Sequence, residues 1–204
     1  MIPPNDLTGL ILAGGEGRRM GGRDKGLELL AGRPLVAHVS ERFAGQVSEL
    51  VISANRHPQN YRRYGDRVVA DQALDGQRGN FHGPLMGLYA GLCTARTPWL
   101  LVAPCDIPAL PRDFAARLIQ GLGNADIAVA HDGQRVHPVI ALMRTDLATA
   151  LGQALDAGKR SVREFYAGRY VNEVDMADCA GELVNVNTPA DKARLEATLA
   201  REAS

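Results

Sequence analysis

The chain has 204 residues and equal numbers of acidic and basic side chains, 23 of each. A chain of this length forms one domain, or one domain with a small appendage, and buries about 70% of its unfolded surface. The balanced charge and the aromatic content of 5% exclude a typical nucleic-acid binder, which needs a basic surface and stacking side chains.

Cysteine usage and the N-terminus indicate the compartment. Cys93, Cys105 and Cys179 are odd in number and widely spaced, which argues against a disulfide framework or a zinc ribbon. We therefore expect reduced thiols in a cytoplasmic protein. The N-terminus lacks the features of a signal peptide, and no apolar run reaches the roughly 20 residues of a membrane helix.

Short apolar runs alternate with helical segments along the chain. We expect strands at 7–12, 49–54, 67–70, 99–103, 126–130, 138–143 and 183–186, and helices at 34–43, 84–95, 111–122, 146–157, 161–166 and 189–200. Thr188 is expected to cap the last helix. The alternation predicts a single three-layer α/β/α domain with a Rossmann-like, mostly parallel sheet.

The segment at 10–26, LILAGGEGRRMGGRDKG, runs from the end of the first expected strand directly into a glycine-rich loop. Glycines let backbone amides approach a ligand closely, and successive N–H groups can form an anion-binding nest. Polyphosphates also need cations, which this loop supplies as Arg18, Arg19, Arg23 and Lys25. We interpret it as a triphosphate-binding loop; the alternative is a flexible, solvated basic loop, a description that fits Arg18 and Arg23 best.

Two better-known glycine loops do not fit this segment. A Walker A loop needs a hydroxyl residue directly after its lysine, whereas Lys25 is followed by Gly26. The dinucleotide fingerprint needs a third glycine at a position that Met20 occupies when the count starts from Gly15 and Gly17.

Polar residues follow the other expected strands, at the sheet edge where parallel α/β sheets bind ligands. They are Ser53, Asn55, Asp71 and Asp106. A carboxylate after an apolar strand, such as Asp106, is costly unless it is paired or bound to a metal. Mg²⁺ takes one or two carboxylates together with substrate phosphates, so Asp106 is the candidate metal ligand. Cys105 is interpreted as a small packed residue, because Mg²⁺ does not select thiolate.

Eight short motifs occur in order along the chain. They are Leu12-Ala13-Gly14-Gly15, Arg19-Met20-Gly21, Asp24-Lys25-Gly26, Ala54-Asn55-Arg56, Gly83-Pro84-Leu85, Pro104-Cys105-Asp106-Ile107-Pro108, His137-Pro138 and Asn185-Val186-Asn187-Thr188-Pro189. With this set the chain resembles the glycosyltransferase-A-like nucleotidyltransferases, and most of all the molybdenum cofactor guanylyltransferase family. The resemblance extends over residues 8–198.

The resemblance implies the nucleotide-diphospho-sugar transferase fold, with a nucleotide half at about 7–110 and an acceptor or pterin half at about 111–200. It implies transfer of GMP from GTP to the terminal phosphate of molybdopterin, with Mg²⁺ and release of pyrophosphate. Because that phosphate is already ionised, the reaction needs positioning and charge neutralisation rather than a side-chain nucleophile. It further implies a monomer in transient contact with molybdoenzymes or their chaperones.

The resemblance also assigns site residues. The catalytic residues would be Arg19, Lys25 and Asp106, with Asp106 holding the metal. The GTP-binding residues would be Leu12, Ala13, Gly14, Gly15, Lys25, Ser53, Asn55, Asp71 and Asp106, and the pterin-binding residues Asn185, Asn187, Lys159 and Arg160. The alternatives are a strand-end cap for Asp71, turn geometry for the asparagines, and a helix-terminal surface for Lys159 and Arg160.

One departure keeps the choice of base open. The family often has asparagine where this chain has Ser53, and a hydroxyl cannot make the paired contacts of an amide. The loop at 72–83 also looks longer than is usual in the family. The alternatives are a CTP-dependent molybdopterin cytidylyltransferase, a sugar-phosphate nucleotidyltransferase and, in a different class, a non-catalytic GTP-binding module.

Overall fold

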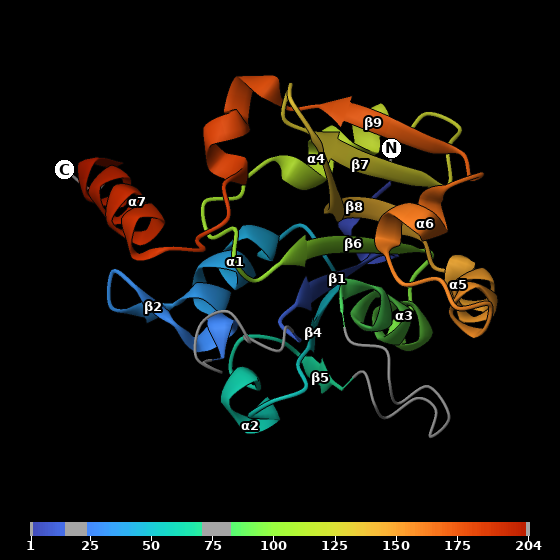
Figure 1. The fold of residues 1–204 in the computed structure, drawn as a ribbon, viewed down its shortest axis with the longest axis horizontal. Helices are drawn as coiled ribbons and strands as arrows, with labels where there is room; N and C mark the ends of the chain where they lie inside the picture. Colours follow the sequence, from blue (N-terminus) through green and yellow to red (C-terminus); the bar gives the residue numbers. More distant parts are fainter. Residues whose placement is uncertain (1, 15–23, 71–82, 203–204) are drawn as a thin grey trace.

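The computed structural model describes residues 2–14, 24–70 and 83–202. Within these ranges, seven strands form one sheet in the order β5-β4-β1-β6-β8-β7-β9 (Figure 1). The strands are β1 (Leu7–Leu12), β4 (Glu49–Ser53), β5 (Arg67–Val69), β6 (Trp99–Pro104), β7 (Ile127–His131), β8 (Val136–Arg144) and β9 (Val171–Asp175). β8 runs antiparallel to β6 and β7, and the other neighbours pair in parallel, which confirms a mostly parallel sheet.

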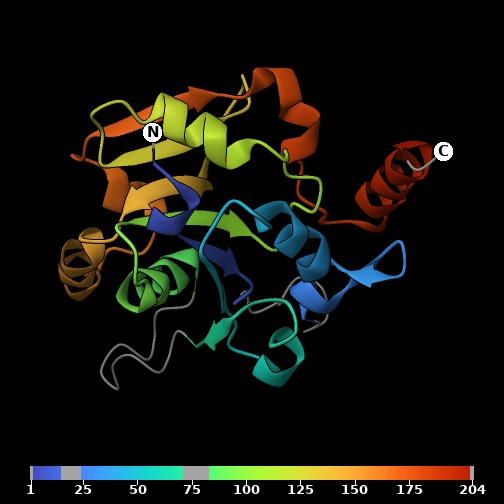
Figure 2. The ribbon, with the colours of Figure 1, turned by 180° about the vertical axis from the view of Figure 1, so that it is seen from behind.

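Helices cover both faces of the sheet. One face carries α1 (Leu35–Phe43) and α4 (Phe114–Gly121); the other carries α3 (Pro84–Thr94), α5 (Leu147–Asp156) and α6 (Val162–Tyr166). In Figure 1, α6 passes in front of β8, whereas α4 lies in front of the sheet in the reverse view of Figure 2. Successive strand residues point to opposite faces, so Leu10 and Ile11 of β1 enter different cores. This arrangement confirms the three-layer α/β/α architecture.

Apart from η1 (Pro4–Asp6), which directly precedes β1, the remaining elements lie around the carboxyl ends of the parallel strands. They are the short helices η3 (Lys25–Leu27), α2 (Pro58–Tyr61) and η5 (Ala177–Leu183), the hairpin of β2 (Leu29–Leu30) and β3 (Arg33–Pro34), and the last helix α7 (Pro189–Glu202). Leu195 anchors α7 against a small core cluster that includes Leu30 and Leu35. Thr188 caps this helix as predicted, since its hydroxyl accepts from the Asp191 amide (3.1 Å) while the Asp191 carboxylate accepts from the Thr188 amide (2.9 Å). Among the described helices, none is both long and apolar enough to span a bilayer.

β1 and α3 show why small residues were needed at the centre of the fold. All six residues of β1 are buried, as expected for a parallel strand with both faces covered. A Cβ at Gly87 of α3 would lie 2.7 Å from Leu12 Cδ2, and one at Gly9 would lie 2.7 Å from Phe43 Cδ1. The glycines therefore let the helices approach β1 closely, as the small-residue composition of α3 predicts.

The expectation of a strand at 183–186 was wrong, and β9 was missed. Residue 183 ends η5, and the next residues are extended but not paired in the sheet. The Val186 amide donates instead to the Asp106 carbonyl (2.8 Å), so this segment is held by the loop after β6. β9 is the edge strand and pairs only with β7 among the described strands. Its polar sequence VNEVD, with one buried residue, lacks the apolar run that identified the other strands.

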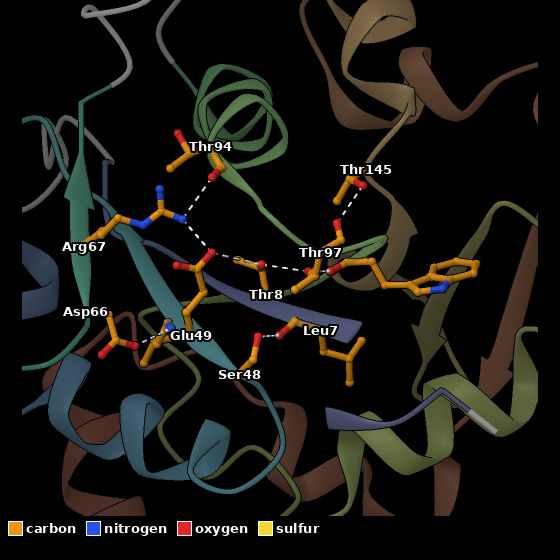
Figure 3. A network of polar contacts seen from close by, with 11 residues as sticks. Leu7, Thr8, Ser48, Glu49, Asp66, Arg67, Thr94, Thr97 and Thr145 are labelled. Atoms are coloured by element: carbon orange, nitrogen blue, oxygen red, sulfur yellow. Dashed lines mark hydrogen bonds and ion pairs between the residues drawn. The ribbon is translucent and has the colours of Figure 1, made fainter. Parts of the chain in front are cut away.

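A buried polar network crosses the end of the sheet where β1, β4 and β5 begin (Figure 3). Thr8 is fully buried, and its Oγ1 lies 2.8 Å from Thr97 Oγ1 and 3.3 Å from Glu49 Oε1. The same Glu49 oxygen accepts from Arg67 (2.6 Å), which also donates to the Thr94 carbonyl (2.9 Å). The network thus links β5, β4 and β1 to the residues that precede β6.

We expect Thr8→Val to lower the free energy of unfolding by about 1–3 kcal/mol, because it removes the hydrogen bonds of the Thr8 hydroxyl to Thr97 and to the charged Glu49 carboxylate while preserving the shape of the side chain. Urea denaturation measures this effect. Thr149→Val in α5 is the matched control, since Thr149 is exposed and valine has a similar helix propensity. Equal stabilities of the two variants would contradict a role for the Thr8 hydroxyl.

Candidate active site

The carboxyl ends of β1, β4 and β6 lie side by side, as predicted for the ligand-binding edge of the sheet. The Ala13 amide donates to the Ser53 carbonyl (2.8 Å), and the Cys105 amide donates to the Leu12 carbonyl (3.0 Å). These bonds continue the pairing of the strands and carry Asp106 to the sheet edge next to β1. In Figure 1 the arrowhead of β6 points toward the side on which α7 lies.

Four polar side chains meet at this edge. Lys25 Nζ lies 2.6 Å from Asp106 Oδ2 and also donates to Asn187 Oδ1. Asn185 Nδ2 donates to the other Asp106 oxygen, Oδ1, at 2.9 Å. The Lys25 and Asp106 side chains are 22% and 16% exposed, so both ions are largely shielded yet remain reachable. The structure therefore brings together predicted residues from three distant segments: Lys25, Asp106, Asn185 and Asn187.

Cys105 is a packed residue, in agreement with its interpretation from the sequence. Its side chain is buried and belongs to the same core cluster as Ile11 and Phe114. Burial raises the pKa of the Cys105 thiol well above its usual value, and the nearby Asp106 carboxylate raises it further. The thiol therefore stays protonated and is unsuited to nucleophilic or metal-binding chemistry.

A cavity of about 710 Å³ opens beside these side chains. Its walls come from the η3 segment, α2 and the residues that lead into α7, and they include Asp24, His57, Asn60, Asn187 and Lys192. Asn187 therefore connects the cavity to the ion pair, because it binds Lys25 and also lines the cavity wall.

A family model described as a MobA-like NTP transferase domain matches residues 9–174. A curated molybdenum cofactor guanylyltransferase of Yersinia pestis (strain Pestoides F) is 46% identical over 190 residues, which cover 93% of this chain and 94% of that protein. The chain belongs to the MobA-like NTP transferase family. Another molybdenum cofactor guanylyltransferase, from Burkholderia vietnamiensis (strain G4 / LMG 22486), is 49% identical, and that match covers 84% of this chain and 87% of the relative.

Solved structures agree with the fold of this MobA-like transferase. The molybdopterin-guanine dinucleotide biosynthesis protein A of Archaeoglobus fulgidus superimposes with a TM-score of 0.74 at 20% identity, covering 95% of this chain and 99% of that one. A likeness at this identity shows the nucleotide-diphospho-sugar transferase fold alone. The family model and the close sequence relatives confirm the predicted enzyme class, a nucleotidyltransferase of the molybdenum cofactor guanylyltransferase family.

The remaining predicted nucleotide residues of the MobA-like transferase have different surroundings. Asn55 is exposed and its Nδ2 lies 3.5 Å from the Gly14 carbonyl, at the rim of the strand ends. Ser53 is fully buried, and a Cβ at Gly87 of α3 would lie 2.9 Å from its Oγ. The Ser53 hydroxyl is therefore covered by α3. Gly15, Arg19 and Asp71 lie outside the described residues.

The hydrogen bonds described for Lys159 and Arg160 go to Glu164 and not to the group around Asp106. Both lie between α5 and α6, where Lys159 Nζ donates to the Glu164 carbonyl (2.9 Å) and the Arg160 amide to the Glu164 carboxylate (2.7 Å). Ser161 and Glu164 form a capping box that starts α6. The local geometry of this turn accounts for these contacts.

A second acidic residue near this end of the sheet is held by a buried histidine. His137 Nε2 lies 2.7 Å from Asp132 Oδ2 in the hairpin that joins β7 to β8. This hydrogen bond, together with the amides of Gln134 and Arg135, holds the pKa of the Asp132 carboxyl well below its usual range. Asp132 therefore remains an ionised turn-former that fixes the hairpin.

Tyr61 and Asp24 form a hydrogen bond near the site that was not predicted from the sequence. The Tyr61 hydroxyl donates to Asp24 Oδ1, and the tyrosine is fully buried beneath the loop that carries Lys25. Because 37 positions separate the two residues, no local pattern in the sequence announces their contact.

Proposed function

We propose that this MobA-like transferase moves GMP from GTP to the terminal phosphate of molybdopterin, forming molybdopterin guanine dinucleotide and pyrophosphate. The observation that carries the proposal is the meeting of Lys25 and Asp106 at the carboxyl ends of β1 and β6. A cation and a carboxylate at this edge are what transfer of a nucleotidyl group from a triphosphate requires. The molybdenum cofactor guanylyltransferases among the close relatives support the choice of GTP and molybdopterin.

In this proposal an oxygen of the acceptor phosphate attacks the α-phosphorus of GTP. The bond between that phosphorus and the α–β bridging oxygen breaks, and pyrophosphate leaves with the electron pair. The backbone of residues 12–14 lines the nucleotide, while Lys25 and Arg19 bind the β- and γ-phosphates and stabilise the leaving group. Asn55 and Asp71 contact the base or ribose. On binding, the triphosphate replaces Asp106 as the main partner of the Lys25 ammonium.

The donor set at Asp106 fits a divalent cation that arrives with its nucleotide. Among the described residues, no three His, Cys, Asp or Glu side chains form a metal-binding group, and Asp106 presents one carboxylate. Mg²⁺ suits such a site, because it prefers oxygen ligands and completes its shell with substrate phosphates and water. When bound there, Mg²⁺ neutralises phosphate charge, while Asp106 holds it and Asn185 orients the Asp106 carboxylate.

The acceptor is assigned to the side of Asn185 and Asn187. Asn187 lines the 710 Å³ cavity next to Lys25, which gives an acceptor room within reach of the nucleotide. In this proposal Lys159 and Arg160, on the turn before α6, bind the anionic groups of the pterin.

The test is the release of pyrophosphate with Mg²⁺, molybdopterin and each of GTP, CTP, ATP and UTP in turn. We expect release with GTP alone. Release with CTP alone would assign the chain to the cytidylyl branch. Release only when a sugar phosphate replaces molybdopterin would overturn the acceptor, and binding of GTP without release in any mixture would indicate a non-catalytic module.

A further inference from the structure

Tyr61 lies directly beneath the loop that presents Lys25. It is the last residue of α2, its side chain is fully buried, and its ring belongs to the core cluster that contains Ile11, Phe43 and Cys105. The ring position is therefore fixed by the core rather than by the loop above it. A group that binds the Tyr61 hydroxyl is therefore held in place by the core.

Two residues of the loop lie against the phenol, one on either side of Lys25. Asp24 Oδ1 accepts the hydrogen bond from the Tyr61 hydroxyl. Gly26 lies so close that a Cβ at this position would be 2.5 Å from Tyr61 Oη and 3.0 Å from Cε1. The phenol thus contacts the loop on both sides of Lys25, through the Asp24 carboxylate and through the backbone at Gly26, where the absence of a side chain permits the close approach.

The hydrogen bond from Tyr61 is hard to replace. Asp24 Oδ2 is buried without a hydrogen-bond partner in the described part of the chain. The buried carboxylate therefore depends on the hydrogen bond that Oδ1 accepts from the phenol. Burial and the hydrogen bond to Asp24 hold the pKa of Tyr61 far above its usual value. The phenol therefore remains a donor at every physiological pH.

We propose that Tyr61 is the positioning residue that holds the Lys25 ammonium at Asp106 through its contacts with Asp24 and Gly26. The kinetic consequence of this inference rests on the proposed function, in which Lys25 is the phosphate-binding cation. The structural consequence does not rest on the proposed function, since the position of Lys25 is measurable without a substrate. Supporting residues of this kind matter because small displacements of a catalytic group reduce the rate strongly.

Chemical labelling tests the structural consequence. The chain has three lysines, Lys25, Lys159 and Lys192, so acylation by a water-soluble ester can be quantified at each by peptide mass spectrometry. In Tyr61→Phe we expect Lys25 to react several times faster than in the parent protein, because it is released from Asp106 and Asn187, with Lys159 and Lys192 unchanged. Unchanged labelling of Lys25 in a folded Tyr61→Phe protein would overturn the inference.

Steady-state kinetics test the functional consequence. We expect kcat/KM for GTP to fall by about tenfold to 100-fold in Tyr61→Phe, with the KM for GTP raised and the KM for molybdopterin unchanged. Tyr64→Phe is the matched control, because Tyr64 contacts Arg63 through its ring and Ser40 through its carbonyl, and we expect wild-type kinetics. A lower melting temperature with both KM values intact would show a merely structural role.

Two further variants keep the test decisive. Asp24→Leu removes the acceptor from the loop side and should reproduce the labelling and KM changes even if Tyr61→Phe folds poorly. Gly26→Ala should raise Lys25 labelling and the KM for GTP more in the parent protein than in the Tyr61→Phe background. In that background the Oη atom that the alanine Cβ would strike is absent. Strictly additive effects would contradict the contact. If the parent protein does not use GTP at all, the proposed function fails while the labelling result still judges this inference.

Discussion

Replacement of Asp106 by asparagine is expected to reduce turnover by about 10³-fold or more, the largest loss that we predict for a single substitution. The substitution keeps the size of the side chain and an oxygen that can accept from Asn185, but it removes the negative charge that would hold Mg²⁺ and pair with Lys25. Pyrophosphate release from GTP and molybdopterin at saturating Mg²⁺ measures the effect.

Asp178→Asn is the matched control for Asp106→Asn. Asp178 of η5 is an exposed carboxylate that pairs with Arg117 of α4, and its described contacts involve neither Lys25 nor Asp106, so we expect its loss to leave turnover unchanged. The melting temperatures of both variants show whether the fold is retained. Near-normal turnover of a folded Asp106→Asn protein would refute the metal-binding role.

Substitution of Lys25 by methionine is expected to reduce kcat by about 10²–10³-fold, by analogy with the loss of one preorganised donor to a developing negative charge. Methionine keeps the length and the apolar stem but removes the ammonium that contacts Asp106 and Asn187. We also expect a higher KM for GTP, because the same cation binds the phosphates in the ground state. Initial rates over a range of GTP concentrations separate the two effects.

The control for Lys25→Met is Arg144→Met, which removes a cation at the opposite end of the sheet. Arg144 lies opposite Trp99, the first residue of β6, and pairs with Asp146. Lys25→Arg should recover little activity, since a planar guanidinium does not replace a compact ammonium between Asp106 and Asn187. Full activity of Lys25→Arg would mean that only the sign of the charge matters at this position.

The sequence predicted the strands that are buried on both faces, and it failed where a strand is polar or an apolar run serves another purpose. β1 and β6 are continuous apolar runs, so their pattern was sufficient. β9 has one buried residue and one strand neighbour among the described residues, so nothing local marked it. Residues 183–186 have a strand-like composition, yet their amide at Val186 bonds to the Asp106 carbonyl instead of to a strand.

The candidate site was predictable to the extent that topology decides it. Parallel strands place their carboxyl ends together, which was enough to associate Asp106 with the glycine-rich loop. The ion pair between Lys25 and Asp106, 81 positions apart, and the contact of Tyr61 with Asp24 depend on how loops pack and leave no periodic signal. Ser53 differs, since its place at the end of β4 predicted a ligand contact, whereas α3 covers its hydroxyl in the structure.

The two asparagines that hold Lys25 and Asp106 come late in the chain. The seven strands of the main sheet are complete by Asp175, so a nascent or truncated chain that stops before Asn185 already contains that whole sheet. Such a product would contain both helical layers, but Lys25 and Asp106 would lack their amide partners, and Leu30 and Leu35 would lose Val186 and Leu195. The residues of the sheet therefore precede the amides that complete the site, and a chain that ends before Asn185 is expected to be inactive although it contains every strand of the sheet.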